Sequence, residues 1–156
     1  MLRRGALTLN WRAIEAAAAR MRQLAPAEAT LFWDGACPLC RREIAYYKWL
    51  DSGERRVEWI DVQAEPERLE AHGVTLEAAL ARIHGLDRRG ALLVGMPAFL
   101  AVWEVLPYWR LLPPIVRSLP FAMPLIDRAY AWWAKRRLGI SARVRALEEG
   151  SACRRK

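Results

Sequence analysis

Short apolar runs alternate with longer helical patterns through the first part of the chain. Residues 29–33 are apolar and partly aromatic, and residues 57–62 form a second run of strand length. Pro38 stands where the first turn of a helix needs no N–H, and the helical pattern continues to Leu50, before the breakers in residues 51–55. A helix of about a dozen residues is long enough for a parallel crossover. We therefore predict a strand–helix–strand unit with parallel strands.

Two further patterns extend this unit into a four-stranded sheet. Residues 83–95 predict two short strands around a turn at residues 87–90, which is typical of a β-hairpin. Ahead of the hairpin, residues 65–83 are rich in Glu, Leu and Ala and predict either one broken helix or two short ones. The pattern as a whole predicts an α/β fold.

The remaining segments predict helices at the two ends of the chain. Residues 96–126 are apolar but interrupted by prolines, so their uninterrupted pieces are shorter than the roughly 20 residues that span a bilayer. We predict short helices there, followed by a longer one at 125–138. Near the N-terminus, helical spacing of apolar residues predicts an amphipathic helix with Leu9, Ile14, Ala17, Met21 and Leu24 on one face. The expected regions are a helical extension (1–28), a core (29–95), a helical appendage packed on the core (96–140) and a basic tail (141–156).

Composition and charge narrow the class of protein. The 156 residues suffice for one domain with its own core, and 54% hydrophobic with 27% charged residues describes a globular chain. Lys and Arg number 25 against 17 Asp and Glu, which gives a net charge of +8. The excess of basic residues lies mostly near the chain ends. A solvated basic face, nucleic-acid binding and contact with an anionic membrane surface all stay open.

The cysteine content indicates the compartment. The chain has 3 cysteines, which excludes the disulfide framework of small secreted proteins. Its first residues are basic but contain no continuous apolar core of the kind found in a secretory signal. We therefore expect a cytoplasmic, reducing compartment, in which a Cys-x-x-Cys pair is more often catalytic or metal-binding than a static disulfide.

Cys37 and Cys40 follow the first predicted strand and begin the first predicted helix. Open α/β sheets place functional sites at this end of their strands. The N–H groups and the dipole at the start of the helix stabilise a thiolate at Cys37, which is therefore the expected exposed nucleophile. Cys40 shares a helix face with Ile44 and Tyr47, so it should face inward and suit the role of resolving thiol.

Neighbouring residues should support this pair. Asp34 and Gly35 form the predicted turn before it, and Pro38 begins the helix. Arg41 and Arg42 bring positive charge close to the thiols and should lower their pKa, whereas Asp34 would raise it if its side chain turned toward the sulfur atoms.

Two other interpretations of the cysteine pair remain open. Structural zinc would need two more ligands, and His72 and His84 lack the spacing of a Cys2His2 finger. Cys153 could supply a ligand only if the C-terminal tail folded back. Two incidental buried thiols would give the same spacing. We expect no bound metal.

Two motifs resemble those of a known family. Residues 33–40, WDGACPLC, resemble the Asp-Gly-x-Cys-x-x-Cys signature of the DCC family of thiol-disulfide oxidoreductases. The family's later helix motif, D-x-x-Y-x-x-x-A-x-x-R, is matched by Asp127, Tyr130, Ala134 and Arg137. The resemblance covers about residues 29–140. It implies a thioredoxin-like fold and thiol-disulfide exchange, with the later motif in a structural role.

The resemblance bears on two further positions. Many members of the family end in a cysteine-bearing tail, so Cys153 is a candidate accessory thiol, with an incidental exposed thiol as the alternative. Thioredoxins proper carry a cis-proline beside the dithiol, which helps to hold an extended substrate. Arg82 and Ile83 stand at that position here, and members of the DCC family also tend to lack the proline. We therefore do not expect substrate docking of the thioredoxin type.

These observations together predict a thioredoxin-like thiol-disulfide oxidoreductase in the cytoplasm. Cys37 and Cys40 would exchange with a protein or small-molecule thiol or disulfide, and no bound cofactor is needed. The alternative is a non-catalytic, thioredoxin-like binding module whose basic, Trp-rich face contacts a membrane surface, nucleic acid or a protein partner. No transmembrane segment is expected, so membrane contact would be peripheral and would use the basic ends of the chain.

Overall fold

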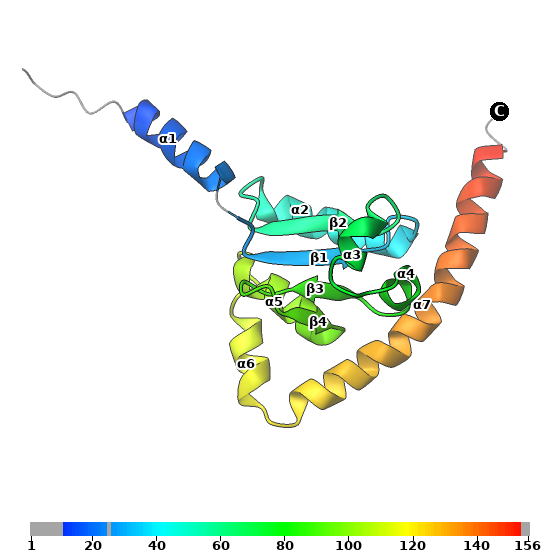
Figure 1. Ribbon diagram of the computed structural model, residues 1–156. Coiled ribbons are helices and arrows are strands. Elements are labelled where there is room, and N and C mark those ends of the chain that lie inside the picture. The colour runs from blue at the N-terminus through cyan, green and yellow to red at the C-terminus, as the bar shows by residue number, and fades with distance from the viewer. Residues whose placement is uncertain (1–10, 25, 154–156) are drawn as a thin grey trace, which may run out of the picture.

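A four-stranded sheet organises the molecule (Figure 1). The computed structural model describes residues 11–24 and 26–153. The strand order is β2-β1-β3-β4. The central strand β1 (Ala29–Trp33) pairs in parallel with β2 (Val57–Asp61) and antiparallel with β3 (His84–Leu86), which pairs in turn with β4 (Leu92–Val94). This arrangement confirms the predicted strand–helix–strand unit, the hairpin and the thioredoxin-like α/β fold.

Helices cover both faces of the sheet. Residues 66–81 form two short helices, which is one of the two predicted alternatives. The helical run breaks at Gly73, which adopts a left-handed φ of +68°. The Thr75 hydroxyl then caps the second helix by accepting the Ala78 N–H at 3.2 Å. The helices are α1 (Trp11–Leu24), α2 (Pro38–Asp51), α3 (Pro66–Glu70), α4 (Leu76–Ala81), α5 (Met96–Val105), α6 (Leu112–Ser118) and α7 (Ala122–Cys153).

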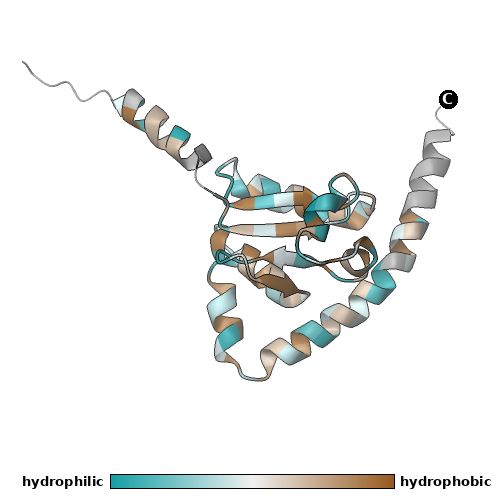
Figure 2. Cartoon of the chain, in the orientation of Figure 1, coloured by the Kyte–Doolittle hydropathy of each residue, from teal (hydrophilic) through white to brown (hydrophobic). Residues whose placement is uncertain are grey.

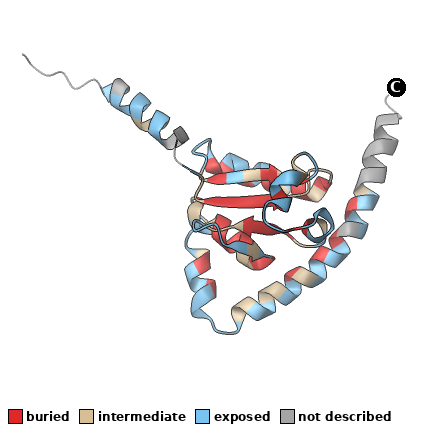
Figure 3. Cartoon of the chain, viewed as in Figure 1, coloured by how far each residue is buried: buried red, intermediate tan, exposed pale blue. Residues whose placement is uncertain are grey.

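Alternate residues of β1 point into two separate cores. Leu31 packs with α2, α5 and α7 on one face of the sheet, and Phe32 packs beneath α3 and α4 on the other. Figure 3 accordingly shows the central strands as buried, and Figure 2 colours apolar residues brown on the strands and on the helices around them. The continuous apolar run of residues 29–33 is therefore that of a central strand covered on both sides.

The long C-terminal helix α7 differs from the sequence-based expectation. We expected a helix at 125–138 and a boundary between the helical appendage and the basic tail after residue 140. Instead, α7 continues to Cys153, so that the boundary falls within a helix. Residues at helical spacing form its buried face: Tyr130, Ala134, Arg137 and Ser141. This face, here called the α7 stripe, packs α7 across the end of the sheet where β1 leads into α2.

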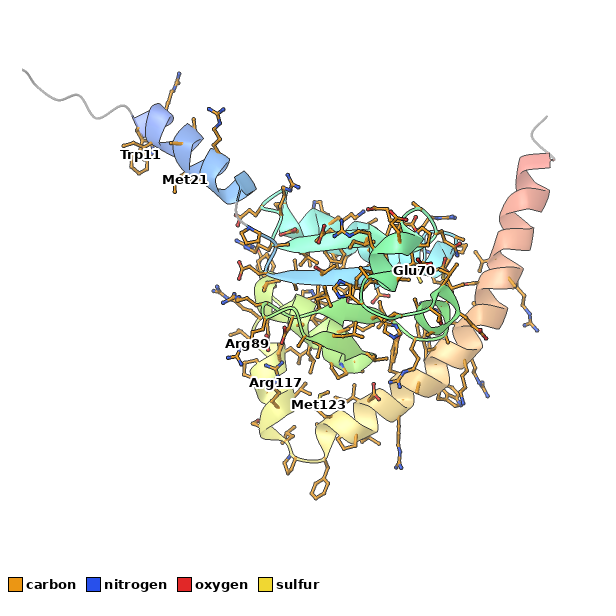
Figure 4. All side chains as sticks on the ribbon, in the orientation of Figure 1. Trp11, Met21, Glu70, Arg89, Arg117 and Met123 are labelled. Carbon is orange, nitrogen blue, oxygen red and sulfur yellow. The ribbon has the colours of Figure 1, made fainter. Side chains whose placement is uncertain are left out.

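The N-terminal helix α1 lies apart from the sheet (Figure 1). It confirms the predicted helix, and its apolar side chains Trp11, Ile14 and Met21 are exposed (Figure 4). Leu9 lies outside the described residues. Across the part of the chain that the structure describes, none of the helices has both the length and the apolarity that a membrane crossing requires.

Candidate functional site

The turn between β1 and α2 is held by two carboxylates. The Asp34 carboxylate accepts the Ala36 N–H at 3.0 Å, and the Asp61 carboxylate at the end of β2 accepts the Gly35 N–H at 3.0 Å. A Cβ at Gly35 would lie 1.8 Å from an Asp61 carboxylate oxygen, so any other residue there would displace the carboxylate that accepts the Gly35 N–H. The turn therefore delivers Cys37 to the N-cap position of α2.

Cys37 is buried rather than exposed. Its side chain is 2% accessible, because α7 lies over it and the Ser141 hydroxyl is 2.9 Å from its Sγ atom. The Cys40 backbone N–H donates to the same sulfur at 3.4 Å. Burial raises the pKa of the Cys37 thiol, but the hydrogen bonds from Ser141 and Cys40, with the charge of Arg137, outweigh burial and leave that pKa below its ordinary value.

Cys40 lies one turn further along α2, in a different environment. Its side chain is 6% accessible, and Nη1 of Arg137 donates to its Sγ atom at 2.9 Å. Burial raises the pKa of Cys40 to about 12, against the opposing charge of Arg137. Ile44 and Tyr47 are buried on the same helix face, as the sequence predicted. The two thiols are therefore distinct, with the proton lost more readily from Cys37.

Arg137 is a buried cation without an ion-pair partner of the usual kind. Its side chain is 5% accessible, Nη2 donates to the Leu80 carbonyl at 3.1 Å, and Nε has no hydrogen-bond partner. Among the described residues, no carboxylate lies within 4.0 Å of its guanidinium, and the side-chain atom to which it donates is the Cys40 sulfur. Burial raises the pKa of the neighbouring Glu43 carboxyl, and the charge of Arg137 opposes that rise. A buried charge that lacks a close counter-ion is costly. The guanidinium is thus placed to stabilise negative charge on sulfur.

The other residues of the later motif fasten α7 to the core. The Tyr130 hydroxyl accepts the Ile83 N–H at 3.2 Å. The Asp127 carboxylate accepts from Arg82 at 2.8 Å and from the Met96 N–H at 3.1 Å. These contacts hold α7 against the segment before β3 and the start of α5. They set the position from which Arg137 reaches Cys40.

Several expectations about the site need correction or addition. We expected an exposed Cys37, but α7 covers it. The positive charge that acts on both thiols comes from Arg137; Arg41 is exposed and donates to the Gly35 carbonyl at 3.4 Å. Asp34 raises the pKa of Cys40, as the sequence analysis anticipated for a carboxylate near sulfur.

Sequence reasoning missed Ser141. Its hydroxyl contacts Cys37, which stands 104 positions earlier in the chain. The available signal was its spacing of four residues from Arg137, which places both on one face of a helix. Cys153 is the last residue of α7, but its side chain is not among those that the structure describes. Within the described residues, no group of three or more His, Cys, Asp or Glu side chains is arranged to hold a metal ion.

Comparison with known proteins places this geometry in a family. A model of the DCC1-like thiol-disulfide oxidoreductases matches residues 31–143, a stretch that includes both thiols and the α7 stripe. The chain belongs to this family. It is also 26% identical over 115 residues to an uncharacterized chloroplastic protein of Arabidopsis thaliana, covering 72% of this chain and 52% of that protein. The chain thus spans about half the length of that relative. No solved structure matches it.

Membership of the DCC1-like family assigns a coarse role. The family is named for thiol-disulfide oxidoreductases, which supports a redox role at the level of the family. The family match ends after residue 143, so it includes Arg137 and Ser141 but neither α1 nor Cys153.

Proposed function

We propose that this DCC1-like chain catalyses thiol-disulfide exchange, with Cys37 as the nucleophile and Cys40 as the resolving thiol. One arrangement carries the proposal: Cys37 caps the start of α2 within 2.9 Å of the Ser141 hydroxyl, whereas Cys40 lies one turn further on and accepts from Arg137, so the pKa values of the two thiols shift in opposite directions. A lowered pKa gives Cys37 a larger thiolate fraction, and only the thiolate attacks a disulfide. The raised pKa keeps Cys40 protonated until it is needed.

The exchange proceeds in two steps that balance. The Cys37 thiolate attacks one sulfur of a substrate disulfide; a mixed disulfide forms, the substrate S–S bond breaks, and the departing thiolate takes a proton from water. Cys40 then loses its proton to water and attacks the Cys37 sulfur; the Cys37–Cys40 bond forms, the bond from Cys37 to the substrate breaks, and the second substrate thiolate takes a proton from water. The protein ends with a Cys37–Cys40 disulfide and the substrate with two thiols. A dithiol reductant restores the protein, and no bound cofactor takes part.

Arg137 supports the second step. Cys40 must become a thiolate inside the protein, where an isolated negative charge is unfavourable. The guanidinium at 2.9 Å from its sulfur supplies the compensating positive charge. Asp127 and Tyr130 act as positioning residues in this scheme, because they fix the helix that carries Arg137.

Three accessory proposals follow from the same chemistry. Asp34, Gly35 and Pro38 shape the turn and the start of α2, and Arg41 contributes a contact to that turn. Cys153 serves in this scheme as an accessory thiol that exchanges with Cys37 or with a partner. The reductant direction suits the reducing, cytoplasmic compartment that the sequence predicts, and the compartment itself stays a prediction.

Reduction of a protein disulfide tests the proposal. The full chain, Cys37→Ser and Cys153→Ser are compared for the rate at which each reduces insulin in the presence of a dithiol reductant. We expect Cys37→Ser to lose at least about 10³-fold of the catalysed rate, as removal of a catalytic nucleophile does elsewhere. Cys153→Ser controls for loss of a thiol as such. Equal rates for the wild type and Cys37→Ser would refute the exchange mechanism.

A second candidate function has one observation in its favour. The corner between α6 and α7 exposes large apolar side chains at Leu119, Phe121 and Leu125, with Phe121 83% accessible, and Ile115 on α6 and Tyr108 and Leu111 before α6 are exposed too. Arg117 and Met123 flank this corner in Figure 4, and Figure 1 shows it protruding beyond the sheet. Apolar side chains exposed near basic residues are typical of a surface that contacts an anionic membrane. We therefore keep membrane-surface binding as the alternative.

Vesicle sedimentation separates the two candidates. Binding to vesicles that contain anionic phospholipid should weaken in Phe121→Asp, weaken with salt, and survive loss of both Cys37 and Cys40. Trp49→Asp is the matched control, because Trp49 is also well exposed but lies on α2. Equal binding by Phe121→Asp and Trp49→Asp would remove the corner from consideration.

A further inference from the structure

The dithiol is closed in the conformation described here. Cys37 and Cys40 are 2% and 6% accessible, and α7 lies over both. A substrate sulfur must contact the sulfur that attacks it, and exchange rates depend on that access. Exchange therefore requires α7 to leave Cys37 for part of the time.

Among the described side chains, three residues of α7 are held to the core by hydrogen bonds around the dithiol. Tyr130 is fixed through the Ile83 N–H, and Arg137 is fixed by the Leu80 carbonyl and the Cys40 sulfur. Ser141 is the last buried residue of the α7 stripe among the described side chains, and the contact that holds it is the one to Cys37. Opening from the C-terminal end would therefore release Cys37 first and leave Arg137 over Cys40.

Gly139 lies between these two contacts. It is exposed, and a Cβ placed there would meet nothing within 4 Å, so packing gives no reason for a glycine. Glycine inside a helix destabilises it relative to alanine because the unfolded backbone has more freedom. A residue of low helix propensity thus stands between the Arg137 and Ser141 contacts.

From this arrangement, and resting on the proposed exchange function, we propose that Ser141 is a positioning residue on a helical cover. While α7 is docked, the Ser141 hydroxyl donates to the Cys37 thiolate; when α7 opens beyond Gly139, Cys37 meets the substrate and Arg137 keeps Cys40 covered. The hydroxyl therefore selects which cysteine is ionised and also holds the cover in place.

The pH dependence of alkylation separates these two roles. The reduced full chain is treated with iodoacetamide between pH 5 and pH 11, and modification of Cys37 is followed by mass spectrometry. The midpoint of the rate profile reports the pKa of Cys37 in the docked state, and the alkaline plateau reports how often α7 opens over the thiolate. The measurement needs no disulfide substrate.

Ser141→Ala should move both readings together. Loss of one hydrogen bond to a thiolate should raise the midpoint by about 0.5–1 pH unit. The same bond holds the cover on the thiolate, so the plateau should rise by the matching factor, about three- to tenfold. Ser141→Thr keeps the hydroxyl and should restore a midpoint near that of the wild type. A midpoint unmoved in Ser141→Ala would overturn the role of Ser141.

Gly139→Ala tests the cover without touching either cysteine. A stiffer helix should lower the plateau by about two- to fivefold and leave the midpoint unchanged. A plateau equal to that of the wild type would overturn the proposed opening. Circular dichroism and thermal melting establish that each variant is folded. If both variants behave as expected but the wild type fails to reduce insulin, the proposed exchange function is wrong and the proposed opening of α7 stands. If the wild type reduces insulin but neither variant behaves as expected, the proposed opening is wrong and the exchange function stands.

Discussion

A charged side chain is buried at each end of α2, and the two side chains differ in how far their hydrogen bonds are satisfied. At the C-terminal end, Asp51 is 4% accessible, and its carboxylate accepts the N–H groups of Arg56 at 3.2 Å and Val57 at 3.4 Å. At the N-terminal end, Arg137 reaches Cys40 with one nitrogen, while its Nε atom has no partner.

This difference separates a structural charge from a functional one. Asp51 satisfies the backbone where the chain enters β2, so it stabilises the loop before that strand. It lines a hollow of about 620 Å³ with Lys48 and Trp59, at the end of α2 away from the thiols. Arg137 has no carboxylate within 4.0 Å among the described residues; it donates to the Leu80 carbonyl and to the Cys40 sulfur, and it lies over the Trp133 ring. In the proposed exchange, its position would serve the negative charge of a thiolate beside it.

The largest expected effect is that of removing the Arg137 charge on the rate of the second exchange step. Arg137→Met keeps much of the volume and removes the charge, so release of the second substrate thiolate should slow by about 10- to 100-fold. The free energy of unfolding should stay the same or rise, because an apolar side chain replaces an incompletely paired buried cation. Stopped-flow measurement of mixed-disulfide decay and a urea titration give the two numbers. A loss of several kcal/mol in stability with unchanged decay would make Arg137 structural.

Asp51→Asn should give the opposite pattern. An amide at this position presents a donor toward one of two backbone N–H groups, so the free energy of unfolding should fall by about 1–3 kcal/mol. The rate of insulin reduction should stay within twofold of the wild type, because the change lies at the far end of α2. Slower reduction in a variant that remains folded would mean that the two ends are coupled through the helix.

The raised pKa of Cys40 should appear in the pH dependence of stability. Folded Cys40 keeps its proton to about pH 12, whereas an ordinary thiol loses it near 9.0. Its contribution to stability is therefore complete below pH 9 and declines as the pH rises from about 9 toward 12. The stability difference between the wild type and Cys40→Ala should fall by about 1 kcal/mol between pH 8 and pH 10. A constant difference would contradict a raised pKa.

The sequence predicted most of the fold because its local signals agreed with the tertiary structure. The apolar run at residues 29–33, Pro38 at the start of α2 and the turn before β4 each specify a local conformation, and all three appear as predicted. The length of α7 was missed. Gly139 disfavours a helix locally, and burial of Ser141 against Cys37 is a long-range contact that no local pattern reports.

The same distinction applies to the candidate site. Cys37, Cys40 and their order along α2 follow from spacing in the sequence. Their electrostatic surroundings do not, because Arg137 and Ser141 come from α7, about a hundred positions away. Arg41 and Arg42 looked closer in sequence, but the charge that reaches both sulfurs comes from a helix that folds back over them. The later motif contained Arg137 without indicating its contact.

Equilibration with glutathione tests the central claim most directly. The full chain is incubated at pH 7 in mixtures of reduced and oxidised glutathione, quenched with acid and analysed by mass spectrometry. If Cys37 and Cys40 form one exchange centre, a single transition should remove two hydrogens from the protein and link these two cysteines to each other. Separate glutathione adducts on the two cysteines, or two thiols that stay reduced in fully oxidised glutathione, would contradict it.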